Sequence, residues 1–138
     1  MTALIVIGYK EFTLGVRKAV EHVFGGEQQR VSYIAADYDA APEKFGQQIR
    51  AQIENLDDGS GIVILADIYG ATHTNTACRL LQPGRVELVS GLNLPMLLRA
   101  LNYRHLPMNE FVDKLVAGGR EGILHTRGPG TSRDEAQA

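Results

Sequence analysis

The chain has 138 residues, with a net charge of −2 from 14 basic and 16 acidic side chains. This length suits one domain, and a hydrophobic share of 44% with a charged share of 22% is typical of globular proteins. The composition excludes a disordered chain, a collagen-like chain and a disulfide scaffold. The balanced charge gives no basic surface for nucleic acid.

The sequence contains no sign of membrane insertion or secretion. No apolar run approaches the roughly 20 residues of a membrane helix, and the first residues lack the basic leader of a signal peptide. The single cysteine, Cys78, has no partner for an internal disulfide, as expected in a reducing compartment. We therefore expect a cytoplasmic protein.

Strands and helices are predicted to alternate along the chain. Short β-branched apolar runs predict strands, and apolar stripes at helical spacing predict helices. In chain order the predicted elements are a strand over 4–7, a helix over 12–24, a strand over 31–34, a helix over 42–56, a strand over 62–65, a helix over 72–81, a strand over 86–89, and helices over 94–103 and 109–117.

Helix ends are predicted from capping and stop residues. Asn93 is a candidate N-cap for the fourth helix. Glycine pairs are expected to stop the first helix at Gly25-Gly26 and the last at Gly118-Gly119. Residues 122–125 are a candidate for a short last strand.

The alternation predicts one α/β domain with an open parallel sheet and helices on both faces. We expect this domain to cover residues 1–125. Residues 126–138 contain no Val, Ile, Leu or Phe, so we expect a frayed, disordered tail there.

The loops that follow the strands are the expected place for a site, because open α/β sheets bind ligands at the carboxyl ends of their strands. The loop after the third strand is the most informative one. Asp67 ends that strand, Gly70 and Ala71 are small, and Thr72 is placed to cap the next helix. Free N–H groups at such a helix start suit a phosphate or another anion. The same pattern is also ordinary strand-end and helix-cap chemistry.

Known nucleotide and metal signatures are missing from the sequence. It has neither a G-x-x-x-x-G-K-[ST] loop nor a G-x-G-x-x-G segment after the first strand. It also lacks H-E-x-x-H, a Cys/His zinc spacing and the G-x-S-x-G elbow of hydrolases. We expect no metal and no cofactor.

Three segments, in order and on the expected elements, resemble a known family. They are Asp67-x-x-Gly-Ala-Thr-x-x-Asn75 after the third strand, Gly91-x-Asn-x-Pro-Met-Leu97 after the fourth, and Gly119-Arg-Glu-Gly122 near the end. Over residues 3–124 the chain resembles the mannose/sorbose-type enzyme IIA domain of the bacterial phosphoenolpyruvate:sugar phosphotransferase system (PTS). That domain is related to the phosphocarrier subunit of dihydroxyacetone kinase.

The resemblance implies a cytoplasmic homodimer with a flavodoxin-like sheet, whose last strand is exchanged between subunits. In the family, a histidine after the first strand takes a phosphoryl group from HPr and passes it to an enzyme IIB partner. It implies that Asp67 orients the acceptor and that Thr72, with Gly70, Ala71, His73 and Asn93 around it, helps to hold the phosphoryl oxygens. The membrane is reached only through a permease complex.

The sequence departs from the family pattern at two positions. Lys10 occupies the place of the acceptor histidine, and His73 occupies the place of a proline. A neutral imidazole, with a pKa of about 6.5, has a free lone pair at neutral pH, whereas a lysine amine, with a pKa of about 10.4, is protonated. A nearby Asp67 favours the charged amine further. We therefore expect Lys10 and Asp67 to form an ion pair.

Several interpretations stay open at this stage. Lys10 either binds an anion beside the Thr72 helix start, or locks the loop so that the protein only docks or regulates partners, or marks a decayed site. His73 is an alternative acceptor, although the sequence offers it no orienting partner. A receiver-like signalling domain phosphorylated on Asp67 is a further alternative, but the acidic pair expected after the first strand is absent.

Overall fold

The computed structural model describes residues 1–129 and 131–132. Its main sheet is parallel, with strand order β2-β1-β3-β4, and five helices accompany it. The strands are β1 (Ala3–Tyr9), β2 (Val31–Ala36), β3 (Ile62–Ala66) and β4 (Val86–Ser90). The helices are α1 (Lys10–Phe24), α2 (Pro42–Leu56), α3 (Thr72–Cys78), α4 (Leu94–Asn102) and α5 (Met108–Glu121). The predicted α/β class and open parallel sheet are confirmed.

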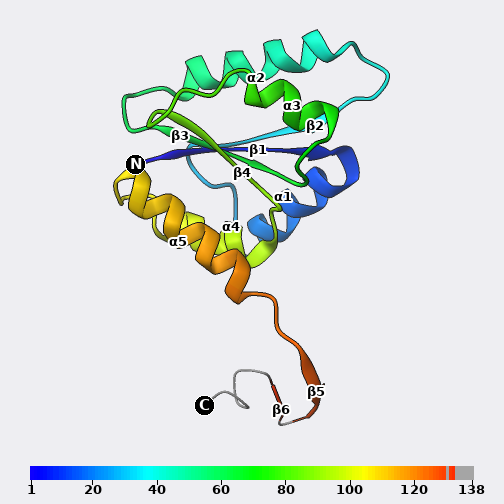
Figure 1. The fold of residues 1–138 in the computed structure, drawn as a ribbon, viewed down its shortest axis with the longest axis vertical. Helices are drawn as coiled ribbons and strands as arrows, with labels where there is room; N and C mark the ends of the chain where they lie inside the picture. The colour runs from blue at the N-terminus through cyan, green and yellow to red at the C-terminus, as the bar shows by residue number, and fades with distance from the viewer. Residues whose placement is uncertain (130, 133–138) are drawn as a thin grey trace.

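Helices cover both faces of the sheet, as Figure 1 shows. Alternate side chains of β1 point to opposite faces, so Ile5 and Ile7 pack with α2 and α3, whereas Leu4 and Val6 pack with α1, α4 and α5. Every residue from Ala3 to Ile7 is fully buried. This double burial explains why the strand is apolar throughout.

The register of the strands gathers their carboxyl ends at one edge. Tyr9 of β1 lies beside Ala36 of β2, Ile7 lies beside Ala66 of β3, and Ala66 lies beside Ser90 of β4. The connections that leave these four ends are therefore neighbours. The loops that the sequence predicts to form a site thus lie together at this edge.

Two helices differ in length from the sequence prediction. Helix α3 ends at Cys78 rather than near residue 81, and α5 runs through Gly118 and Gly119 to Glu121. A Cβ on Gly118 would lie 2.9 Å from Cβ of Arg99 on α4, and one on Gly119 would lie 2.7 Å from Cε of Met96. The glycines therefore allow α5 to pack closely on α4, and the predicted stop at this pair was wrong. The stop at Gly25, which adopts a left-handed conformation with φ of 79°, is confirmed.

The C-terminal segment also differs from the prediction. Residues 122–125 form no strand and do not join the sheet. Instead β5 (Thr126–Gly128) pairs antiparallel with β6 (Thr131–Ser132), away from the main body (Figure 1). These strands lie in the segment expected to be frayed, whereas residues 130 and 133–138 lie outside the described residues. The structure leaves Ile123 and Leu124 exposed, at 73% and 51%.

The opposite edge of the sheet, where the strands begin, contains a buried arginine. Arg104 is 7% exposed, and its guanidinium donates to the carbonyl oxygens of Gln29 at 2.7 Å and Arg30 at 3.2 Å. Its own carbonyl accepts from the amide of Thr2 at 2.9 Å. Burial and the nearby Arg30 guanidinium lower the pKa of Arg104. Arg104 thus ties the α4–α5 connection to the starts of β1 and β2.

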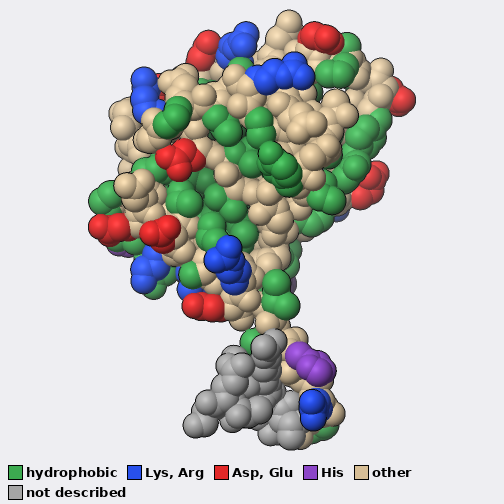
Figure 2. All heavy atoms as spheres, in the orientation of Figure 1, with side chains coloured by type: hydrophobic (Ala, Val, Ile, Leu, Met, Phe, Trp, Pro, Cys, Tyr) green, Lys and Arg blue, Asp and Glu red, His purple; other side chains and the backbone are tan. Residues whose placement is uncertain are grey.

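The surface carries charges of both signs. On the face drawn in Figure 2, the basic and acidic side chains are interspersed between hydrophobic ones. None of the helices within residues 1–129 has the length and apolar character needed to cross a membrane.

Candidate functional site

Asp67 connects two strand ends at the carboxyl edge of the sheet. Its Oδ1 accepts from the amide of Ile68 at 2.8 Å, and its Oδ2 accepts from the amide of Tyr9 at 3.0 Å. The side chain is only 7% exposed. These donors hold the carboxylate between the loops that follow β1 and β3.

His73 is the third hydrogen-bond partner of Asp67. Its Nε2 lies 2.7 Å from Oδ1 of Asp67, and the imidazole is 4% exposed. The rings of Tyr9 and Phe45 meet it edge-on, with centroids at 5.1 and 6.2 Å. Because an ionised carboxylate only accepts hydrogen bonds, Nε2 carries a proton. Within residues 1–129 and 131–132, the second ring nitrogen, Nδ1, has no hydrogen-bond partner.

The expected ion pair between Lys10 and Asp67 was wrong. Lys10 is the first residue of α1 and is exposed, and no ion pair joins it to any described carboxylate. Asp67 is instead occupied by two backbone amides and by His73. An exposed ammonium keeps its hydration, and an added contact with a buried carboxylate would remove part of it. The orienting partner that the sequence did not reveal for His73 is therefore Asp67 itself.

The turn between β3 and α3 is held by short-range hydrogen bonds. Thr74 Oγ1 donates to the carbonyl of Ile68 at 2.6 Å, and Thr76 Oγ1 donates to that of Thr72 at 2.8 Å. Gly70 has a φ of 90°, a conformation that glycine adopts without strain.

The cap of α3 lies one residue earlier than predicted. Ala71 is the N-cap and makes no side-chain cap bond, while Thr72 is the first helical residue. The prediction of Thr72 as the cap was therefore wrong. Gly70, Ala71 and Thr72 nevertheless lie together at the helix start, next to His73. Their role in holding phosphoryl oxygens stays a prediction.

Asn93 is the N-cap of α4, as predicted. Its Oδ1 accepts from the amide of Met96 at 2.9 Å, and its Nδ2 donates to the carbonyl of Gly119 at 3.0 Å. Both ends of the amide thus hold α4 and α5 in place. These bonds use only one of the two N–H donors of the amide, and its part in anion binding stays a prediction.

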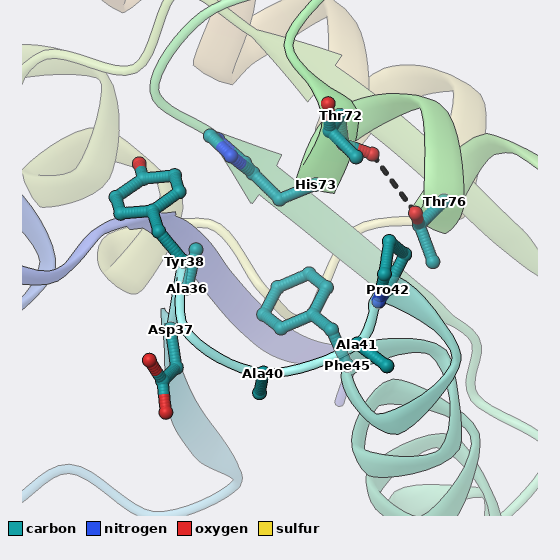
Figure 3. A pocket seen from close by; sticks show the side chains of 10 residues that line it. All are labelled: Ala36, Asp37, Tyr38, Ala40, Ala41, Pro42, Phe45, Thr72, His73 and Thr76. Carbon is teal, nitrogen blue, oxygen red and sulfur yellow. Dashed lines mark hydrogen bonds between the residues drawn. The ribbon is translucent and has the colours of Figure 1, made fainter.

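A cavity of about 220 Å³ lies beside His73, between the β2–α2 connection and α3. Figure 3 shows the imidazole between Tyr38 and Thr72, with the Phe45 ring on the opposite side of the pocket. The loss of hydration, together with Tyr9, raises the pKa of the Tyr38 phenol. This phenol therefore stays protonated at neutral pH.

Sequence reasoning missed three aromatic residues of this site. The rings of Tyr9 and Tyr38 contact each other, with centroids at 5.2 Å, and Phe45 lies on the far side of His73. A signal was present, because Tyr9 ends β1 and Tyr38 follows the end of β2, and both ends belong to the ligand-binding edge. Chemically, the arrangement presents an aspartate-oriented imidazole under an aromatic rim.

Comparisons with known proteins agree with the fold. Residues 3–116 match the family described as PTS system fructose IIA component (EIIA-man). The PTS system mannose-specific EIIAB component of Escherichia coli (strain K12) is 30% identical over 126 residues, which cover 89% of this chain and 39% of that protein. The chain thus spans about two fifths of the length of this relative.

Two further proteins are similar along most of their own length. The PTS system fructose-specific EIIA component of Bacillus subtilis (strain 168) is 25% identical over 128 residues, covering 89% of this chain and 85% of that protein. The crystal structure of phosphotransferase system component EIIA from Streptococcus agalactiae gives a TM-score of 0.80 at 25% identity, covering 91% of this chain and 97% of that one. The chain therefore belongs to the EIIA-man family of PTS IIA components.

Proposed function

We propose that this chain is an EIIA-type protein that docks onto the partners of the phosphotransferase system, an HPr-like donor and an EIIB-like acceptor, without being phosphorylated at Lys10. The observation that carries this proposal is the occupation of Asp67 by His73, at 2.7 Å, while Lys10 is exposed. The chain keeps the family fold and the loops at the carboxyl edge of the sheet. The position of the acceptor has no usable nucleophile.

The chemistry of phosphoryl transfer supports this assignment. The incoming phosphorus must meet a nitrogen lone pair, in line and at close range. An exposed lysine amine is protonated at neutral pH and offers no lone pair. Asp67, which is implied to orient the acceptor, is engaged elsewhere. The function left for this surface is then to bind partner proteins and regulate them without phosphoryl transfer.

A second candidate is phosphoryl transfer through Nδ1 of His73, and it is favoured by the same Asp67–His73 contact. Asp67 would orient this imidazole much as it is implied to orient the family acceptor. The burial of the ring is the argument against it, since 4% exposure leaves little room for the in-line approach of a second protein. The receiver-like alternative has less support, because both oxygens of Asp67 are already bonded.

The decisive experiment incubates the chain with phosphoenolpyruvate, enzyme I and HPr, and follows its intact mass. We expect no stable phosphoryl addition, together with saturable binding to HPr in a parallel NMR titration. A mass increase that maps to His73 would establish the second candidate. Addition at Lys10, or the absence of any binding to HPr and to EIIB, would overturn the docking proposal.

A rebuilt acceptor separates the two candidates further. Lys10→His alone should accept little, because His73 still holds Asp67. Lys10→His combined with His73→Pro should accept clearly more. Proline fits there, since His73 is the second residue of α3 and Pro95 already occupies the second position of α4. His73→Pro alone is the matched control and should accept nothing.

We also propose that the protein is a cytoplasmic homodimer that meets the membrane only through a permease complex. The exposed Ile123 and Leu124, and the β5–β6 pair beyond them, support an exchange of the C-terminal segment between subunits. Light scattering after size-exclusion chromatography should give twice the chain mass. Ile123→Ser with Leu124→Ser should shift this to the monomer, and a monomeric native chain would contradict the proposal.

A further inference from the structure

The cavity beside His73 lies on the face of the sheet that α2 and α3 cover, whereas Lys10 begins α1 on the other face. Its walls come from the end of β2, the start of α2 and the first turns of α3 (Figure 3). The cavity shares Tyr38, Phe45, Thr72 and His73 with the site but does not include Lys10 or Asp67. What it binds is independent of whether the chain docks onto PTS partners.

The size and the walls of the cavity suit a small apolar molecule. Half of its ten lining residues are apolar, namely Ala36, Ala40, Ala41, Pro42 and Phe45. An enclosed apolar cavity of about 150 Å³ is large enough for benzene, and this hollow of about 220 Å³, which is partly open to solvent, is somewhat larger. A single ring with one small substituent fits this space.

Among the described residues, the buried imidazole of the wall has one nitrogen without a partner, whereas the wall's other unpartnered hydroxyls, of Tyr38 and Thr72, belong to exposed residues. His73 is 5% exposed, and its Nε2 is bonded to Asp67. The bond to the carboxylate places the proton on Nε2, so Nδ1 keeps its lone pair and acts as an acceptor. No described residue donates to it. The hydroxyl of Thr76, also in the wall, is already used by the carbonyl of Thr72. A ligand with one hydrogen-bond donor in the cavity would give this nitrogen a partner.

The charges around the cavity favour a neutral ligand. An anion would meet the lone pair of Nδ1, with the carboxylate of Asp67 behind it. A cation would lose its hydration against apolar walls with no counter-charge free to bind it, because the hydrogen bonds of Asp67 engage both oxygens. Asp37 points away from the cavity in Figure 3, and its Oδ1 accepts from the amide of Asp39.

From these observations we infer that the cavity is a binding site for a neutral single-ring molecule with one O–H or N–H donor, which is directed at Nδ1 of His73. Phenol is the simplest probe of this class. Anisole has the same ring but no donor, and benzoate has the ring with a negative charge. These three compounds test shape, hydrogen bonding and charge separately.

The experiment is an NMR titration of the full, ¹⁵N-labelled chain with each probe. Phenol should shift the amide signals of Thr72, His73 and Thr76 in a saturable way. Anisole should bind about fivefold more weakly, the factor expected from one neutral hydrogen bond, and benzoate should give no saturable shift. Equal binding of phenol and anisole, tighter binding of benzoate, or no saturable shift with phenol would overturn the inference.

Two variants assign the binding to this cavity. Ala41→Leu, at the exposed cap of α2, should fill the space and abolish binding of both phenol and anisole. Ala51→Leu, exposed farther along α2 and outside the lining, is the matched control and should leave binding unchanged. His73→Phe keeps a ring but removes Nδ1, so the preference for phenol over anisole should disappear. A preference that survives in His73→Phe would rule out the assigned hydrogen bond. None of these readouts depends on phosphorylation.

Discussion

The two edges of the sheet each bury one charged side chain, and backbone groups of opposite kind bond to it. At the carboxyl edge, Asp67 accepts from the backbone amides of Tyr9 and Ile68. At the amino edge, Arg104 donates to the carbonyl oxygens of Gln29 and Arg30. Among the described residues, neither side chain bonds to a group that always carries the opposite charge. His73, which bonds to Asp67, is charged only when both of its ring nitrogens are protonated. The backbone thus supplies donors at one edge and acceptors at the other.

The largest effect is expected from Arg104→Ala. The carbonyls of Gln29 and Arg30 would lose a charged donor, and the buried stem would leave a void, so the free energy of unfolding should fall by about 3 kcal/mol. Urea denaturation measures this change. Arg85→Ala, which removes an exposed ion pair with Asp57, is the control and should change it by less than about 1 kcal/mol. If both variants cost the same, the amino edge does not depend on its buried cation.

A smaller loss is expected from Asp67→Ala. The amides of Tyr9 and Ile68 and the imidazole of His73 would lose their common acceptor, at a cost of about 2 kcal/mol of unfolding free energy. Water can reach these exposed amides, which limits the loss compared with Arg104. Thermal unfolding followed by circular dichroism tests the order of the two variants. A larger loss for Asp67→Ala than for Arg104→Ala would reverse the comparison.

Gly8→Ala, in β1, tests the position of the Asp67 carboxylate. A Cβ on Gly8 would lie 2.9 Å from Cγ and 3.0 Å from Oδ2 of Asp67, so the carboxylate must shift away from its donors. We expect a loss of about 1–2 kcal/mol, together with a change in the His73 ring signals in NMR spectra. Gly15→Ala, where a Cβ has nothing within 4 Å, is the control and should not destabilise the protein. Unchanged His73 signals in Gly8→Ala would mean that Asp67 is free to relocate.

The smallest effect is expected at Lys10, and its sign is opposite. Lys10 is exposed at the start of α1, where the helix dipole disfavours a positive charge. Lys10→Glu should raise the free energy of unfolding by about 0.3–1 kcal/mol, measured at low salt, and Lys10→Gln should give part of this gain. A destabilised Lys10→Glu would indicate that the amine has a favourable partner in solution.

The sequence allowed most of the fold to be predicted, because its signals are local. The β-branched runs gave the four strands of the sheet, and Gly25 and Asn93 marked helix boundaries that the structure keeps. The stop at Gly118 was wrong because a glycine that permits close helix packing looks the same in sequence as one that ends a helix. Only the neighbouring helix α4 distinguishes the two cases.

The position of the candidate site could be predicted from the sequence, but the hydrogen bonds within it could not. The rule for parallel sheets located Asp67 and the loops around it. The partner of Asp67 could not be chosen, because Lys10 and His73 both follow strand ends, and the choice depends on which one is buried. The structure decides for His73, which is 5% exposed, against the exposed Lys10. The cavity beside it depends on three separate elements and leaves no local pattern.

The contact between Tyr9 and Tyr38 gives this protein an optical reporter of its own. The chain contains five tyrosines and no tryptophan, so its ultraviolet emission comes from tyrosine. Two of these five fluorophores lie 5.2 Å apart at the rim of the site, with 45% and 62% of their surface exposed. A partner that brings a tryptophan to this edge would receive their excitation energy, and its arrival would be visible without any label.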